Sequence, residues 1–473
     1  MKVLFFAMPD TVSALDAVLR MPNLGLCSIA GNLEGCDVKV VDLAFHSRRL
    51  TQYVRSLMDE VRPDLVGLSA MSFQFASACR VAGICRSANP AVKVALGGYH
   101  ASLMCEEIAA GKEAGLFDFM IRGEGEITFN RLVQEIISGR EDFGSISGLS
   151  FRTRWGFQHN QPAPLADLDE IRLPDRGCRL LHTAHFFGQP FDCVETSRGC
   201  SMGCNFCSIT QMYGRSIRFF KPERVIAELK LLKQKGTRGV FFVDDNITLD
   251  VRRLKKLCEM IAAENLNTMS YAIQASVKGI SSDPELAACL KKANFIWVFL
   301  GIESGIGRNL ESMGKEGVLN NTQLAISLLQ AQDICVFGGF IVGNPEDTRQ
   351  DILYTYRFAL DSGVDHPIIQ CLTPYPRTNT REELMAEGLI TNGDDFSRYN
   401  GFICNVRTRH LSNSQLSQAM MWGGIKLYFH PRYLKRSRFW RFEPSLWPVL
   451  LGNNIRHILG AARGRLFEST HSW

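Results

Sequence analysis

Three closely spaced cysteines are the residues of this chain best suited to holding a metal cofactor. Cys200, Cys204 and Cys207 have the spacing C-x3-C-x2-C and directly follow a predicted strand. A loop at such a strand end can wrap three thiolates around one iron–sulfur cubane, which leaves one iron free to bind another molecule. Zinc is disfavoured, because no further Cys or His follows at a spacing that would close a four-ligand site.

Six predicted strand–helix units include this loop and define an α/β fold. The clearest helix, 222–235, has proline in its first turn and one apolar face, and a glycine follows it. Such units build an open, partial (β/α)6 barrel, whose catalytic residues lie at the carboxyl ends of the strands. We expect this barrel to occupy 191–385, with strands at 193–196, 239–243, 271–274, 296–301, 336–342 and 367–372.

The cysteine motif also resembles a known signature. Phe206 supplies the aromatic residue of C-x3-C-x-aromatic-C, which is similar to the motif of the radical S-adenosylmethionine (SAM) superfamily. The resemblance implies a 4Fe-4S cluster whose open iron binds SAM through its amino and carboxylate groups. It also implies an external electron donor, flavodoxin or ferredoxin. The electron cleaves SAM to methionine and a 5′-deoxyadenosyl radical, which takes hydrogen from a substrate; no catalytic side chain is assigned.

One strand end resembles the superfamily's adenine-binding pattern. The run Gly339-Phe-Ile341-Val-Gly343-Asn-Pro-Glu346 fits G-x-I-x-G-x-x-E. The resemblance implies that these four residues lie beside the adenine of SAM. A glycine pair in a strand also allows backbone to approach a ligand closely.

Polar residues end three other barrel strands. Asp244 and Asp245 stand where many relatives carry Gly-Gly-Glu for the amino group of SAM; a helix N-cap is the alternative role. Gln274 and Ser276 could meet the ribose or the carboxylate. Glu303 could hydrogen-bond SAM or balance its sulfonium charge. For these last three residues a structural role is almost equally supported.

The first 135 residues predict a second α/β unit. Their strands are apolar enough to be buried on both faces, which indicates a doubly wound parallel sheet covered by helices. The ligand of such a domain sits at the carboxyl ends of the strands. The strands are expected at 3–8, 38–43, 65–70, 92–97 and 119–122.

Small residues at two of these strand ends resemble a cobalamin-binding module. Ser69-Ala-Met71, followed after 25 residues by Gly97-Gly98, is similar to the Ser-x-Leu…Gly-Gly half of that module's signature. A small hydroxyl and a glycine pair would leave a slot for the nucleotide tail of cobalamin. A domain that binds nothing, or a different nucleotide, is the alternative.

Two further features of this domain depart from the signature or extend it. The Asp-x-His-x-x-Gly segment is absent, since no His precedes His46. We therefore expect cobalamin with neither its own base nor a His below the cobalt. The turn Arg122-Gly-Glu124-Gly-Glu126 recurs in this subclass, and its sequence assigns it no function.

Bulk properties limit the location and the partners of the chain. It has a net charge of +5, fifteen cysteines and no long uncharged apolar run. We expect a cytoplasmic protein with reduced thiols.

A connector is expected at 136–190 and a helical region at 386–473. Basic and aromatic residues gather at 426–442. Packing on the chain's own domain is favoured there, peripheral membrane contact stays open, and no nucleic-acid partner is expected.

Together these features resemble the cobalamin-dependent radical SAM enzymes. Such enzymes most often methylate an unactivated carbon, using methylcobalamin recharged by a second SAM. The layout is similar to that of the anaerobic magnesium-protoporphyrin monomethyl ester cyclase and of bacteriochlorophyll and hopanoid methyltransferases. This implies a large apolar substrate, a tetrapyrrole or an isoprenoid lipid. The alternatives are an oxidative cyclase and a non-catalytic carrier of cobalamin and an iron–sulfur cluster.

Overall fold

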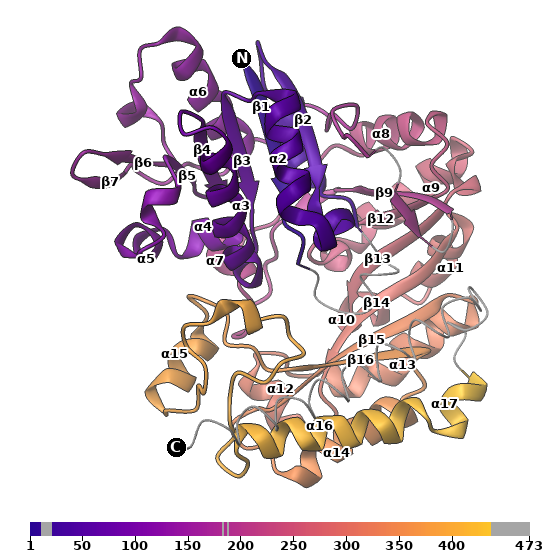
Figure 1. Cartoon of the computed structure of the whole chain (residues 1–473). Coiled ribbons are helices and arrows are strands. Elements are labelled where there is room, and N and C mark those ends of the chain that lie inside the picture. The colour runs from indigo at the N-terminus through magenta and orange to yellow at the C-terminus, as the bar shows by residue number, and fades with distance from the viewer. Residues whose placement is uncertain (11–20, 182–183, 187–188, 437–473) are drawn as a thin grey trace, which may run out of the picture.

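Two parallel sheets and a helical carboxyl-terminal region make up the molecule. The computed structural model describes residues 1–10, 21–181, 184–186 and 189–436. Figure 1 shows the first sheet, in indigo and purple, beside the second, in pink and orange. The expected α/β architecture, with a doubly wound domain before a partial barrel, is confirmed.

The first sheet is parallel across five strands and has the order β2-β1-β3-β4-β5-β6-β7. Its last two strands are antiparallel additions that lie in the expected connector. The domain boundaries at 135, 190 and 385 stay predictions. The strands are β1 (Lys2–Ala7), β2 (Asp37–Asp42), β3 (Leu65–Ser69), β4 (Lys93–Gly97), β5 (Phe119–Ile121), β6 (Leu149–Thr153) and β7 (Gly156–His159).

Helices cover both faces of this sheet, because its apolar strands must be buried on both sides. One face packs against α2 and α3, and the other packs against α1 and α6. Two short helices follow β4. The helices are α1 (Leu24–Gly31), α2 (Leu50–Val61), α3 (Phe75–Ala88), α4 (Tyr99–Leu103), α5 (Cys105–Ala110) and α6 (Gly125–Ser138).

The second sheet contains the six expected parallel strands in chain order. It curves as an open barrel (Figure 1). β8 (Ala184–Phe186) adds an antiparallel strand at one edge. Every residue of β15 is buried. The parallel strands are β9 (Gln189–Val194), β12 (Gly239–Phe242), β13 (Ser270–Ser276), β14 (Phe295–Glu303), β15 (Cys335–Val342) and β16 (His366–Cys371).

Helices between these strands form the outer layer of the barrel (Figure 1). In α8 proline occupies the first turn, where its missing N–H costs no hydrogen bond. The helices are α7 (Ile209–Tyr213), α8 (Pro222–Gln234), α9 (Val251–Ala263), α10 (Val277–Ser281), α11 (Leu286–Lys292), α12 (Gly307–Ser312), α13 (Val318–Ala331) and α14 (Arg349–Asp361).

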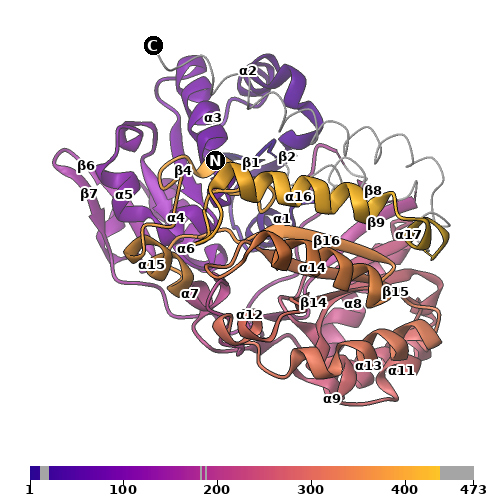
Figure 2. The ribbon, with the colours of Figure 1, turned by 90° about the horizontal axis from the view of Figure 1, so that it is seen from below.

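The carboxyl-terminal helices α15 (Asn379–Ala386), α16 (Asn413–Tyr428) and α17 (Pro431–Arg436) lie on the barrel, and Figure 2 shows α16 beside β16 and α14. Tyr433 Oη lies 2.8 Å from His366 Nδ1, and Tyr428 Oη donates to the carbonyl of Pro367 at 2.8 Å. The basic and aromatic segment therefore packs on the barrel as far as Arg436. Its remainder, 437–442, lies outside the described residues. Within the described part of the chain, no helix is both long and apolar enough to cross a bilayer.

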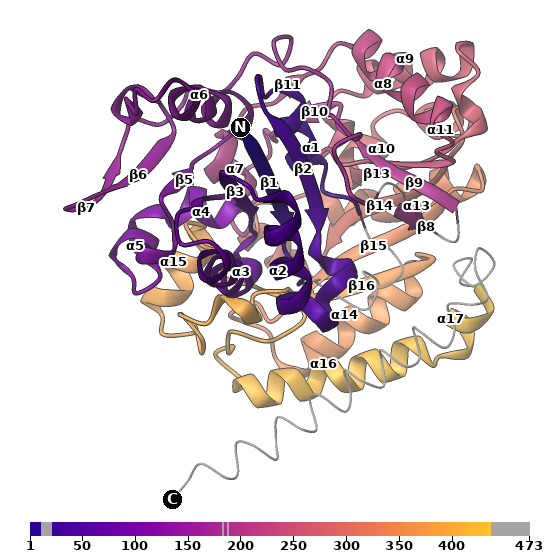
Figure 3. The same cartoon turned by 45° about the horizontal axis from the view of Figure 1, so that its top comes forward.

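The first domain also contributes to the barrel interior. Leu24, at the start of α1, packs in one cluster with barrel side chains that include Phe191, Phe241, Trp297 and Phe337. Figure 3 labels α1 beside β1 and β2 of the first sheet. One helix of the first domain therefore contributes a side chain to a hydrophobic cluster of the barrel.

Candidate active site

The cysteine loop is anchored on both sides. It follows β10 (Ser197–Arg198), which pairs antiparallel with β11 (Arg218–Phe219). On the far side, Asn205 donates its backbone N–H to the carbonyl of Met313 at 3.2 Å and its side-chain amide to that of Ser312 at 2.9 Å. The barrel therefore fixes the loop before any cofactor binds.

The three thiols lie close together in a partly buried site. Burial raises the pKa of Cys207 to about 12, and the neighbouring Cys204 and Cys200 raise it further. Within the described residues, no three His, Cys, Asp or Glu side chains close on one point as they would around a single ion. Three thiolates from one short loop can hold three irons of a cubane cluster, whose fourth iron stays open. A bound cation would also offset the cost of forming thiolates here.

A buried lysine faces these cysteines. Lys315 Nζ donates to Glu303 Oε1 at 2.6 Å, and both side chains are about nine-tenths buried. Burial lowers the pKa of Lys315, but the negative charges of Glu303 and Cys204 raise it more. The ammonium has further N–H donors to offer an anionic group. Sequence reasoning did not single out Lys315, because only the fold brings it to the cysteines.

Asp244 and Asp245, adjacent in the sequence, have different roles in the structure. Asp244 is buried and accepts from Thr196 N–H at 3.1 Å, from Thr196 Oγ1 at 2.6 Å and from Ser197 Oγ. It therefore stabilises the entry to the cysteine loop. Asp245 is half-buried and, within the described residues, accepts one hydrogen bond, from Gly199 N–H at 3.2 Å. Burial raises the pKa of Asp245 to about 6. Asp245 is the carboxylate with acceptor capacity to spare.

The other polar residues at the strand ends have protein partners. Ser276 caps α10 by accepting from Gly279 N–H at 3.1 Å. Gln274 donates weakly to the carbonyl of Asp244 at 3.4 Å. Ser276 therefore has the structural role that its sequence left open, whereas Gln274 retains its amide oxygen for a ligand.

The adenine pattern is divided between the core and the surface. A Cβ on Gly339 would lie 2.6 Å from the ring of Phe299, so this glycine makes room for an aromatic side chain. Ile341 and Gly343 are buried. Glu346 is instead exposed and pairs with Arg409.

The buried carboxylate of this turn belongs to the next residue. Asp347 accepts from the backbone N–H groups of Gly343 and Asn344 at 2.8 and 2.9 Å. It thereby holds the turn after β15. The sequence pattern ended one residue earlier, at Glu346.

Tyrosines connect the first domain to the cysteine loop. Tyr99, which follows Gly97-Gly98 at the start of α4, lies against Tyr213 of α7 and near Asp245 and Cys207. Tyr375 also lies near Cys207, and burial raises the pKa of its hydroxyl to about 12. The tyrosines therefore remain uncharged at neutral pH, and each presents an apolar ring with a polar hydroxyl at its end. Their positions in separate motifs hid this grouping in the sequence.

The carboxyl edge of the first sheet is bare. Ser69 and Gly97 are paired across β3 and β4, and the Ser69 hydroxyl has no partner within the described residues. A Cβ on Gly97 would make only ordinary contacts at 3.8 Å and beyond. Beyond β3, Met71 is 43% exposed. This edge has room and an unused hydroxyl, so it fits the tail of a large cofactor.

The neighbouring glycine and histidine complete this edge. Gly98 has φ +92°, and a Cβ there would lie 2.7 Å from the carbonyl of Ala70. Two residues on, His100 is buried, and its Nδ1 has no hydrogen-bond partner among the residues that the structure describes. Burial lowers the pKa of His100 to about 4, so its ring is neutral.

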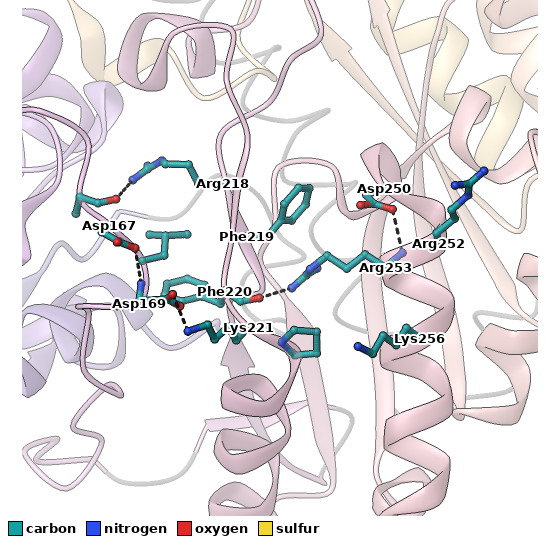
Figure 4. A pocket seen from close by; sticks show the side chains of 13 residues that line it. Asp167, Asp169, Arg218, Phe219, Phe220, Lys221, Asp250, Arg252, Arg253 and Lys256 are labelled. Carbon is teal, nitrogen blue, oxygen red and sulfur yellow. Dashed lines mark hydrogen bonds and ion pairs between the residues drawn. The ribbon is translucent and has the colours of Figure 1, made fainter.

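A surface groove of about 650 Å³ lies along β11 and the first turns of α8 and α9 (Figure 4). Arg253 crosses its floor, donating to the carbonyls of Thr196 and Phe220 at 2.9 Å. Arg252 and Lys256 are exposed on α9 and have no ion-pair partner in the described residues. The groove therefore offers free positive charge.

A doubly wound domain with a bare strand edge, facing a partial barrel with three grouped cysteines, defines a class of two-cofactor enzymes. Family models agree with this assignment: the radical SAM superfamily matches 194–359 and the B12 binding domain matches 11–133. The chain belongs to the radical SAM superfamily, in the branch that carries a cobalamin-binding domain. It is therefore a radical SAM enzyme with a 4Fe-4S cluster, SAM and cobalamin as cofactors.

Three curated relatives extend over most of the chain. An uncharacterized methyltransferase of Pyrococcus horikoshii is 30% identical over 444 residues, covering 93% of this chain and 95% of the relative. The anaerobic magnesium-protoporphyrin IX monomethyl ester cyclase of Rubrivivax gelatinosus is 27% identical, covering 92% and 79%. The hopanoid C-3 methylase of Methylococcus capsulatus is 28% identical, covering 80% and 72%.

A solved structure has the same fold. The cobalamin-dependent SAM radical enzyme OxsB, with aqua-cobalamin and SAM bound, superposes with a TM-score of 0.72 at 17% identity. The superposition covers 97% of this chain and 72% of OxsB. The arrangement of the two domains is therefore one already seen with both cofactors in place.

Proposed function

We propose that this enzyme is a C-methyltransferase that acts on an unactivated carbon of a large apolar substrate. The observation that carries the proposal is the contact between Tyr99 and Tyr213. It brings the bare strand edge of the cobalamin domain against the cysteine loop. A substrate held between these two sites would meet both cofactors.

Residues of the chain take the following roles in this proposal. Cys200, Cys204 and Cys207 hold the cluster, and Asp245 accepts from the amino group of SAM. Ser69, Gly97 and Gly98 receive the tail of cobalamin. When bound, the cluster and SAM supply a radical that removes hydrogen, and cobalamin supplies the methyl group.

The neighbouring side chains orient SAM and exclude water. Lys315, with donors to spare, faces the carboxylate of SAM or the cluster. The partly buried tyrosines Tyr99, Tyr213 and Tyr375 form apolar walls that shield a reactive intermediate from water. The names of the relatives support a substrate of the tetrapyrrole or isoprenoid class.

Product mass tests the proposal. A strain lacking the gene and its parent would be compared by mass spectrometry of apolar metabolites. We expect a parent-specific product that differs from its precursor by one methyl group in place of hydrogen. Labelled methionine should place its methyl carbon in that product. A product without the label would contradict methyl transfer.

Oxidative cyclisation is the second candidate, and the 92% coverage by the protoporphyrin cyclase favours keeping it. It would add oxygen and remove hydrogen, so the same spectra separate the two reactions. A non-catalytic carrier does not stand, because the chain is a radical SAM enzyme.

An external electron donor must reduce the cluster. We propose that a flavodoxin or ferredoxin docks at the groove of Figure 4, where Arg252 and Lys256 can attract its acidic surface. Arg253, which lines this groove, donates to the carbonyl of Thr196. Thr196 is four residues before Cys200 in the sequence. Replacing Arg252 and Lys256 by Glu should slow reduction by flavodoxin but not by dithionite. Equal slowing by both reductants would contradict this site.

We place the reaction in the cytoplasm, and contact with a membrane surface would suit a lipid substrate.

A further inference from the structure

The Arg122-Gly-Glu124-Gly-Glu126 turn lies at the junction of the two domains. It connects β5 to α6 at the carboxyl edge of the first sheet, near Gly97. Its glycines have structural reasons: Gly123 has φ +78°, and a Cβ on Gly125 would lie 2.7 Å from Ile29 of α1. This backbone brings both glutamates to the barrel.

The two glutamates bind arginines of the β10–β11 ribbon. Glu124 Oε1 accepts from Arg198 Nη1 at 3.0 Å and from Arg218 Nη2 at 2.7 Å. Glu126 Oε1 accepts from Arg198 Nη2 at 2.6 Å and from Ser28 Oγ at 2.6 Å. The side chains of Glu124, Glu126 and Arg198 are all less than a tenth exposed. Charged hydrogen bonds in such a site are short and geometrically specific.

The ribbon cannot supply this stabilisation from its own two strands. Arg198 and Arg218 are directly opposite each other in the β10–β11 pairing. Like charges at paired positions destabilise a two-stranded sheet. Glu124 lies between the two guanidinium groups and offsets their repulsion. Glu195, next to the ribbon, also accepts from Arg198 Nε at 3.0 Å, but among the described residues only Glu124 forms ion pairs with both arginines. The conformation of the ribbon therefore depends in part on a residue of the other domain.

The same ribbon leads into the cysteine loop. Arg198 is two residues before Cys200, and Gly199 between them has φ +86°. A Cβ on Gly199 would lie 2.5 Å from the carbonyl of Ser216, so the chain has little freedom there. A shift of Arg198 would therefore move the first cluster ligand.

We propose that Glu124 and Glu126 are positioning residues that fix the cluster loop relative to the cobalamin edge of the first domain, and so set the distance between cobalt and cluster. Below, the cobalt–cluster clamp means Glu124, Glu126, Arg198 and Arg218. The inference rests on the cofactors and on the cysteine ligands, and it holds whichever reaction the enzyme performs.

A second contact between the domains provides a matched control. Arg377, in the turn after β16, donates to Glu107 of α5 at 2.6 Å, but both side chains are almost half exposed. Exposed ion pairs contribute little, whereas loss of one partner of a buried pair leaves an uncompensated charge. Glu107→Gln should therefore leave the relation between the domains unchanged.

Pulsed electron paramagnetic resonance on the full-length protein, loaded with cluster and cobalamin and reduced with dithionite, measures the proposed quantity. Both the reduced cluster and cob(II)alamin carry an unpaired electron, so their dipolar coupling reports their separation without any substrate. We expect one narrow distance in the unaltered protein and in E107Q. In E124Q/E126Q we expect that distance to be lost to a broad distribution, with iron and cobalamin content retained.

A narrow, unchanged distance in E124Q/E126Q would overturn the proposal. If the double variant does not fold, E124D and E126D decide, because each keeps its charge but is one methylene too short for the observed contacts. Broadening in both supports the clamp, and the unaltered distance in both overturns it. If the unaltered protein shows the narrow distance but its cells make no methylated product, the proposed function alone fails.

Discussion

The carboxyl edges of the two sheets differ in how they are prepared for their cofactors. At the ends of β3 and β4 the edge of the first sheet is bare: Ser69 has an unused hydroxyl, and Gly97 has no side chain. The edge of the barrel is charged, and its groups already bind one another, as Asp244 binds Thr196 and Glu303 binds Lys315. A large cofactor with its own polar groups needs room, whereas a charged cluster needs a loop held in advance.

The largest expected effect belongs to the charged edge. Replacing Cys200, Cys204 and Cys207 together by Ala should remove all cluster iron and all reductive cleavage of SAM, while cobalamin still binds. Anaerobic reconstitution with iron and sulfide assays measures the first result. Ala at Cys36, Cys79 and Cys105, which are also partly exposed, is the matched control. Four irons bound to the triple variant of the motif would refute the assignment.

At the bare edge, substitutions of Gly97 and Gly98 should have different effects, the first on cobalamin binding and the second on stability. Gly97→Leu has space for its Cβ, so the protein should fold but bind cobalamin at least tenfold more weakly, about 1.4 kcal/mol. Gly98→Ala should instead destabilise the fold by about 1–3 kcal/mol, because φ is +92°. Cobalamin titration and thermal unfolding measure the two effects. Equal cobalamin affinity in Gly97→Leu and the unaltered protein would exclude this edge as the binding site.

Variants of the Lys315–Glu303 pair test whether ion pairs at the carboxyl edge of the barrel stabilise the folded protein. Lys315→Met leaves a buried carboxylate without a partner, so the free energy of unfolding should fall by about 3–5 kcal/mol. Adding Glu303→Gln should recover most of this loss. Lys230→Met, which breaks the exposed pair with Glu264 at 2.7 Å, should cost less than about 1 kcal/mol. Similar losses in the Lys315 and Lys230 variants would show that the pair is not effectively buried.

The last effect appears only as a change of stability with pH and concerns Glu195 beside the cobalt–cluster clamp. Burial raises its pKa from 4.5 to about 7, against the charge of Arg198, and Glu126 and Asp244 raise it further; Tyr213 and Arg224 also face it. The folded state therefore holds a proton that the unfolded state releases. Between about pH 5 and 7, stability should fall with rising pH by up to about 1.4 kcal/mol per unit. Chemical denaturation across this range should show a shallower slope in Glu195→Gln; an unchanged slope would place the titration elsewhere.

Local sequence signals predicted the elements and the cysteine loop. The helix expected at 222–235 is α8 (Pro222–Gln234), because its apolar spacing and flanking residues are local properties. Contacts between distant residues gave no such signal. Glu124 and Arg198 are 74 positions apart, and neither lies in a pattern that indicates its partner.

Neighbouring residues of similar type were equally hard to separate. Glu346 and Asp347 are both acidic, but backbone geometry turns Asp347 inward and leaves Glu346 on the surface. Asp244 and Asp245 differ in the same way. Sequence identifies the chemical groups near a strand end, whereas the turn decides which of them faces a ligand.

The position of Leu24 limits how freely the two domains of such enzymes can be exchanged during evolution. Its side chain belongs to the first domain in sequence but lies among the aromatic residues of the barrel. A barrel paired with a foreign cobalamin domain would lose this contact and expose apolar surface to water. Chimaeras joined near residue 190 should therefore be poorly soluble unless α1 accompanies the barrel. The two halves are expected to have diverged as one inherited unit rather than by exchange of modules.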